Sequence, residues 1–125
     1  MHCAQCHDPH GASIMKSAGG LAMARLNQQC APCHREQVKP VVFEHEALRE
    51  GCTVCHQPHG SINAKMLVQP DNNLCLRCHA QVQGQAGNFF VGKQPHPPFL
   101  QRGTCWSSGC HTAVHGSNMN PHMRY

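Results

Sequence analysis

The hydrophobic positions of this 125-residue chain form only short periodic runs. Segments 26–36 and 72–82 are rich in helix formers, and each begins near an asparagine, Asn27 or Asn72, of the kind that caps a helix. Segment 43–50 places apolar residues four apart on one side of a third short helix. Loops are predicted where glycine or proline gathers, at 19–20, 70–71, 84–87 and 95–98.

The composition argues against a large protein core. Only six residues are aromatic, and much of the apolar fraction is alanine and cysteine. A chain of this length corresponds to one domain, and we expect residues 1–125 to form it. Small domains with so little to bury need covalent or metal staples. The pattern and composition together predict a mostly irregular fold with a few short α-helices and little or no sheet.

Four segments share the spacing Cys-x-x-Cys-His, and a fifth has four residues between its cysteines. We call them motifs 1 to 5: 3–7, 30–34, 52–56, 75–79 and 105–111. The short spacing is the attachment signal of c-type haem. Two thiols add to the two vinyl groups of a porphyrin, and the adjacent histidine becomes the proximal iron ligand. The predicted attachment residues are Cys3, Cys6, Cys30, Cys33, Cys52, Cys55, Cys75, Cys78, Cys105 and Cys110, and the proximal ligands are His7, His34, His56, His79 and His111.

Other cysteine chemistry explains the pattern less well. Zinc ribbons and redox dithiols also use paired cysteines, but neither needs a histidine after every second cysteine. A disulfide or a zinc site remains the alternative for motif 5. Its wider loop contains Gly109 and two serines, which lets the backbone bulge and still present both sulfurs. We therefore expect five haem c groups, which would supply the missing core as a chain of stacked haems.

Seven further histidines are candidates for the distal face of the iron. Three of them follow the second cysteine of motifs 1, 3 and 5 by four or five residues and precede a glycine. Two others lie seven and nine residues upstream of motifs 3 and 5. These five repeat and are the predicted distal ligands: His10, His59, His115, His45 and His96. His2 and His122 do not repeat and are not assigned to an iron.

The motifs alternate in a two-haem unit that is used two and a half times. A unit has an upstream histidine, a motif followed by His-Gly, and then a plain motif; residues 45–79 form the one complete copy. The chain opens in the middle of a unit. This is typical of the continuation of a longer array, or alternatively of a self-contained protein whose start was trimmed.

The His-Gly histidine is too close to its own motif to wrap from one haem face to the other. We therefore expect it to reach the next haem, so that each iron joins two chain segments. Methionine is the competing distal ligand and would raise the reduction potential. Met15 and Met66 are the candidates, although packing against a haem face is the favoured interpretation of both.

Charge and cysteine usage indicate where the protein works. The formal charge of +4 is not a nucleic-acid signal, because five ferric haems with their propionates would add roughly −5. Haem attachment and cysteine richness both indicate an exported, periplasmic or extracellular protein. The chain shows no signal peptide and no apolar run of membrane-spanning length.

Three phrases resemble a known family. The phrases are C-x-x-C-H-x-P-H-G, F-x-H-x-x-L-x-x-G-C and the closing C-H-x-x-V-H-G-S-N. They are similar to the MtrA/DmsE-type decahaem periplasmic cytochromes, in particular to their C-terminal pentahaem half, and to the related pentahaem NrfB. The resemblance implies a stacked wire of low-potential bis-histidine haems. It also implies a quinol-linked donor and either a terminal reductase or an outer-membrane porin conduit as acceptor.

Electron transfer is the function that these features favour. An enzyme of the nitrite or hydroxylamine kind needs an open iron position, and no motif carries a lysine in place of its histidine. We therefore predict that the protein is not an enzyme. The alternative is a subunit of an extracellular cytochrome filament, in which haems stack between copies. Redox proteins are the expected partners, and nucleic acid is not.

Overall fold

A computed structural model describes residues 2–7, 10, 27–83, 89–91, 94–96 and 100–124. Short helices and turns dominate these ranges. The 3₁₀-helices are η1 (Cys3–Gln5), η3 (Glu46–Arg49), η4 (Cys52–Val54) and η5 (Ala64–Met66), and the α-helices are α2 (Arg35–Val38) and α3 (Asp71–His79). The prediction of a mostly irregular fold with few helices is confirmed.

Two small antiparallel sheets complete the described secondary structure. Strand β1 (Phe43–Glu44) pairs with β5 (Gly116–Ser117), so that Phe43 lies opposite Ser117. The second sheet has the order β2-β3-β4, from Ala80–Gln83, Phe89–Val91 and Gln94–Pro95. The first sheet joins the middle of the chain to its C-terminal segment, which matters for the histidines described below.

Two of the three predicted helices are wrong in part. Segment 26–36 forms a helical turn at 27–30 and then breaks before α2. Pro32 explains the break, because it has no amide hydrogen with which to continue the ladder. Segment 43–50 begins as strand β1 because residues 43 and 44 pair with β5, and only Glu46–Arg49 is helical. The predicted loops at 19–20 and 84–87, and the second half of the predicted loop 95–98, lie outside the described residues. Pro95 lies in strand β4, and Asp71 of the predicted loop 70–71 begins helix α3.

The third predicted helix, 72–82, is right for most of its length. Helix α3 covers Asp71–His79, and the chain then becomes strand β2, whose backbone pairs with β3. The predicted capping role of the asparagines is wrong. The amide groups of Asn27 and Asn72 bind instead to the chain that precedes the next motif.

The described side chains bury very little. Leu67 is the buried hydrophobic residue, at 8% exposure, whereas Ile62 and Val42 are fully or largely exposed. The total accessible surface is 9715 Å² for 13.7 kDa, against about 6600 Å² expected for a compact monomer of that mass. The described side chains therefore form little hydrophobic core of their own, as the composition predicts.

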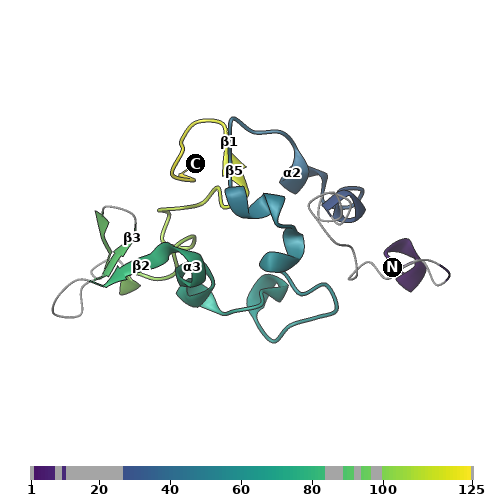
Figure 1. Ribbon diagram of the computed structural model, residues 1–125, viewed down its shortest axis with the longest axis horizontal. Coiled ribbons are helices and arrows are strands. Elements are labelled where there is room, and N and C mark those ends of the chain that lie inside the picture. Colours follow the sequence, from purple (N-terminus) through teal and green to yellow (C-terminus); the bar gives the residue numbers. More distant parts are fainter. Residues whose placement is uncertain are drawn as a thin grey trace.

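Figure 1 shows how the segments are arranged. From α2 the chain runs to β1, returns through η3 and η4, passes through a long bend to α3, and extends into the β2–β3 hairpin. The C-terminal segment then comes back to place β5 beside β1. Motifs that are far apart in sequence are thereby brought around one region of the molecule.

Two glycines offer a matched test of this arrangement. Gly116 has φ of +124°, and a Cβ there would lie 2.5 Å from Val41 Cγ2 and 2.9 Å from the Phe43 carbonyl oxygen. Gly60 has a similar φ of +118°, with nothing within 4 Å of such a Cβ. We expect G116A to lower the free energy of unfolding by about 1–3 kcal/mol more than G60A, because only G116A adds a clash to the strain. Chemical denaturation followed by circular dichroism measures this difference, and equal losses would contradict the β1–β5 packing.

Candidate haem sites

The attachment motifs share one backbone turn. The histidine amide donates a hydrogen bond to the carbonyl of the first cysteine in motifs 1, 2 and 3, at 2.8 to 3.0 Å. Motif 4 forms the last part of helix α3. The turn brings the histidine back toward the first cysteine of its own motif. All ten cysteines lie in the described residues, and no disulfide joins any of them.

Motif 5 closes in the same way despite its wider spacing. The amide of His111 donates to the carbonyl of Cys105 at 3.0 Å. The extra residues bulge outward, where the Ser108 hydroxyl donates to the Thr104 carbonyl at 2.8 Å and Gly109 adopts φ of +75°. The glycine therefore provides the freedom that the sequence predicts. The wide loop leaves the histidine-to-cysteine turn of the other motifs intact.

Three pairs of histidines lie ring to ring, and each pair joins a proximal histidine to a predicted distal one. The ring centroids are 5.6 Å apart for His7–His59, 6.1 Å for His79–His45 and 6.2 Å for His56–His115. The two rings of each pair are inclined by 19° to 25°. Residues separated by tens of positions in sequence therefore form opposed imidazoles.

Two of the three ring pairs have the spacing of two imidazoles that share a metal. In the first pair the Nε2 atoms of His7 and His59 are 3.4 Å apart. The centroid distance exceeds this by about 2.2 Å, twice the roughly 1.1 Å from ring centre to ring nitrogen, so the rings meet edge to edge. A metal–imidazole bond is about 2 Å long, which puts the centroids of two opposed ligands about 6.2 Å apart. The other two pairs lie at that distance.

Four histidines have their other ring nitrogen engaged by a backbone carbonyl. A proton on Nδ1 that is donated to a carbonyl leaves the Nε2 lone pair available to a metal, and it also orients the ring. The bonds run from His45 to Val114 (2.9 Å), from His56 to Lys65 (3.0 Å), from His96 to Gln94 (2.9 Å) and from His111 to His122 (2.6 Å).

Two of these carbonyls belong to a loop that the fold uses twice. After the His-Gly phrases that follow motifs 3 and 5, a serine closes the loop: Ser61 Oγ donates to the Leu67 carbonyl, and Ser117 Oγ donates to the Arg124 carbonyl. The loop then returns to its own motif and offers a carbonyl to the proximal histidine. Lys65 adopts φ of +57° in the first copy. The His-Gly segment therefore holds the proximal histidine as well as carrying a distal candidate.

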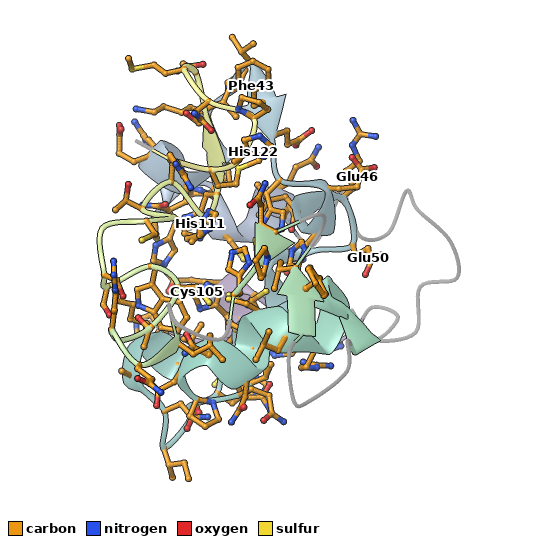
Figure 2. All side chains as sticks on the ribbon, turned by 90° about the vertical axis from the view of Figure 1, so that its left-hand side faces the viewer. Phe43, Glu46, Glu50, Cys105, His111 and His122 are labelled. Carbon is orange, nitrogen blue, oxygen red and sulfur yellow. The ribbon has the colours of Figure 1, made fainter. Side chains whose placement is uncertain are left out.

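Figure 2 shows the second copy of this loop. His111 and Cys105 come from the C-terminal segment, above α3, and His122 lies on the far side of His111 from Cys105. A hydrogen bond from His111 Nδ1 to the His122 carbonyl joins these two histidines. Sequence reasoning did not assign His122, and the structure shows that its backbone orients a proximal histidine.

The pairing differs from the expectation that a His-Gly histidine reaches the next haem. His59 follows motif 3 but lies against His7 of motif 1, and His115 follows motif 5 but lies against His56 of motif 3. Each reaches back by two motifs. The upstream histidine His45 lies against His79 of motif 4. The pairing of β5 with β1 explains the second case, because it carries residues 114–117 back to the middle of the chain.

The remaining candidates are placed as follows. Among the described residues, no second histidine ring lies against His34 or His111. His10 and His96 both lie within described positions, and each makes interactions. Met15 lies outside the described residues. The side chain of Met66 is 47% exposed.

Neighbouring motifs bring their thiols together in sequence order. Burial, the charge of Cys52 and a hydrogen bond with Cys52 raise the pKa of Cys30 to about 11, with a smaller effect from Cys6. Burial and the corresponding interactions with Cys105 raise the pKa of Cys75 to about 12. Burial, and then Cys78, raises the pKa of Cys55. Each motif is thus in electrostatic contact with the next.

Two paired histidines are held in the neutral form that a metal ligand requires. Burial, and then His45 and His111, lowers the pKa of His79. Burial, and then His56, lowers the pKa of His115. Both shifts favour the neutral imidazole.

The donor set fits haem iron better than a free metal ion. Within the described part of the chain, no group of three or more Cys, His, Asp or Glu side chains converges to hold a metal ion. The donors come as opposed pairs of histidines instead. Such pairs would supply both protein ligands of an iron whose other four ligands are porphyrin nitrogens.

Sequence reasoning assigned no functional role to several residues that the structure brings into the site. The side chains of Asn27 and Asn72 and the carbonyl of Lys65 contact motif residues directly. Repetition was the available signal: both asparagines lie three residues before the first cysteine of a plain motif, and His-Gly-Ser occurs twice, at 59–61 and 115–117.

The chain is similar to known proteins that carry the same motifs. A family model described as "Doubled CXXCH motif" matches residues 1–39 and 45–84. The multiheme cytochrome MtrA of Shewanella baltica (strain OS185) is 36% identical over 124 residues, which cover 94% of this chain and 35% of that protein. The chain therefore spans about a third of the length of this curated relative.

Proposed function

Because this chain belongs to the doubled CXXCH motif family of multihaem c-type cytochromes, we propose that it relays electrons along five covalently attached haems. The opposed histidine pairs carry this proposal, since two of them have the ring spacing of two imidazoles on one iron and the Nε2 atoms of the third face each other at 3.4 Å. Haem c supplies reversible one-electron chemistry at iron. The protein supplies attachment, the two axial ligands, their orientation and the spacing between successive sites.

The ring pairs support an assignment of the axial ligands. We assign His7 with His59 to the iron of motif 1, His56 with His115 to that of motif 3, and His79 with His45 to that of motif 4. His34 and His111 are the proximal ligands of the other two irons, and His10 and His96 are their proposed distal ligands. Every iron then has two imidazoles, which favours a low reduction potential relative to a histidine–methionine pair.

An iron with two protein ligands has no position for a substrate. We therefore propose that the protein is an electron carrier and not an enzyme. The Nδ1–carbonyl bonds of His45, His56 and His111 support this role, because they fix each ring with Nε2 unprotonated. Rigid ligands keep the same coordination in both oxidation states, which suits repeated electron transfer.

The electrostatic interactions between cysteines of successive motifs support an order for the haems. Cys6 interacts with Cys30, Cys30 with Cys52, Cys55 with Cys78, and Cys75 with Cys105. Each thiol is an attachment point of its own porphyrin, so successive motifs place successive porphyrin edges near one another. We propose a single wire in the order of motifs 1 to 5.

Partners and location are also proposals. Covalent haem and the likeness to MtrA support an exported, periplasmic or extracellular protein that exchanges electrons with other redox proteins. A quinol-linked cytochrome is the proposed donor, and a terminal reductase or an outer-membrane conduit is the proposed acceptor. None of the described helices is long and apolar enough to cross a bilayer.

The haem count tests the proposal most directly. We expect the purified protein to show a c-type pyridine haemochrome spectrum and an intact mass equal to the polypeptide plus five haems. Its ferric EPR spectrum should contain low-spin signals alone, because every iron has two imidazoles. A colourless sample, or the bare mass of the polypeptide, would contradict the proposed function.

A further inference from the structure

We propose that Asn27 and Asn72 are positioning residues, each of which fastens a plain motif to the motif that follows and sets the contact between their two haems. The inference rests on the proposed haem loading. It groups four of the five haems into two pairs, which we call dyads. One dyad holds the haems of motifs 2 and 3, and the other holds those of motifs 4 and 5.

Asn72 uses both ends of its amide. Its Oδ1 accepts from the backbone N–H of Cys105 at 2.8 Å and from the thiol of Cys105 at 3.1 Å. Its Nδ2 donates to the Gly103 carbonyl at 3.2 Å. Asn72 lies in helix α3, three residues before Cys75, the first cysteine of motif 4. One side chain therefore binds both the first residue of motif 5 and the backbone two residues before it.

Asn27 repeats the arrangement one unit earlier. Its Oδ1 accepts from the backbone N–H of Cys52 at 2.9 Å and from the thiol of Cys52 at 3.0 Å. Its Nδ2 donates to the Leu48 carbonyl at 2.7 Å. Each asparagine lies three residues before the first cysteine of its own motif, Cys30 or Cys75. The same residue type at the same position makes the same bonds in both copies.

The bonds of each asparagine bring the first cysteines of two successive motifs near each other. The thiol of Cys52 raises the pKa of Cys30, and the thiol of Cys105 raises that of Cys75, so the two first cysteines of each dyad lie within electrostatic reach of each other. All four are first cysteines of their motifs, so each asparagine aligns the same attachment point of two porphyrins. No asparagine bond of this kind joins motif 3 to motif 4 among the described residues.

Haem attachment leaves the fastening in place. A thioether has no hydrogen, so the bond from each thiol to Oδ1 is lost on attachment. The bonds of Oδ1 to the cysteine amide and of Nδ2 to the preceding carbonyl involve no reacting atom. Leucine, which has a similar shape, can make neither bond, and aspartate keeps the acceptor but loses the donor.

The test compares N72L and N27L with the wild-type protein and with two neighbouring controls, N73L and Q28L. Asn73 and Gln28 are exposed and lie next to the proposed positioning residues. Circular dichroism in the Soret band measures the relative orientation of neighbouring porphyrins as a two-signed couplet, and intact mass counts the haems. We expect N72L and N27L each to lose about a quarter of the couplet and the double variant about half, because each asparagine sets one of the four contacts between successive haems. N73L and Q28L should match the wild-type protein.

The low-spin EPR signals should stay unchanged in every five-haem variant, since the axial histidines are not altered. A wild-type couplet in five-haem N72L and N27L would overturn the inference while leaving the haem wire intact. If a leucine variant loads only four haems, N72D and N27D decide the matter. Five haems with a reduced couplet in these variants support the fastening, and five haems with the full couplet overturn it. A colourless wild-type protein would instead refute the proposed function itself.

Discussion

Replacing His59 with alanine is expected to convert one ferric haem from low-spin to high-spin while all five haems stay attached. His59 lies in no attachment motif, and its Nε2 faces that of His7 at 3.4 Å. Loss of this ring would leave the iron of motif 1 with one protein ligand. EPR spectroscopy measures the spin state, and intact mass confirms the haem number. Unchanged spectra would remove His59 from the ligands.

A second variant identifies the affected haem. In a C3S/C6S background motif 1 cannot attach its haem, so adding H59A should produce no new high-spin signal. If a high-spin signal still arises, His59 binds another iron and the assignment to motif 1 is wrong. This experiment separates the structural pairing from the expectation that a His-Gly histidine reaches the following haem.

Two controls accompany H59A. H122A should keep every haem low-spin, because His122 contributes its backbone carbonyl to the site and alanine retains that carbonyl. H59M should keep the haem six-coordinate but raise its reduction potential, since thioether ligation favours ferrous iron relative to imidazole. A high-spin signal in H122A would show that its side chain is also a ligand.

Replacing both cysteines of motif 5 is expected to remove one haem. The C105S/C110S variant should carry four haems by mass and haemochrome, because His111 closes the same turn on Cys105 that the shorter motifs form. C105S alone should retain five, with one haem held by a single thioether. The C52S/C55S variant of a short motif provides the matched comparison and should also lose one haem.

The opposite result has a clear meaning. If C105S/C110S carries the same number of haems as the wild-type protein, motif 5 carries no haem and the count is four in both. His111 would then have no iron to bind, and the orientation of its ring by the His122 carbonyl would serve another purpose.

Local structure could be predicted only where local bonds decide it. Helix α3 matches the expected 72–82 over most of its length because its hydrogen bonds join residues four apart. Segment 43–50 was predicted as helix, but pairing with residues 116 and 117 makes its first two residues a strand. Asn72 was predicted as a cap, yet its partners lie more than thirty residues away. Propensity carries no information about such distant partners.

The sequence by itself determined the chemistry of this protein, since thiols and histidine act on one porphyrin only when a few residues separate them. It also identified which other histidines repeat and are candidates to complete the irons. Only the tertiary structure decided which histidine faces which motif. Those choices depend on loops closing over 34 to 59 residues, as in His45–His79 and His56–His115, and on the β1–β5 pairing that holds one of them closed. Spacing along a chain cannot specify such closures, because the entropic cost of closing a long loop changes little with its length.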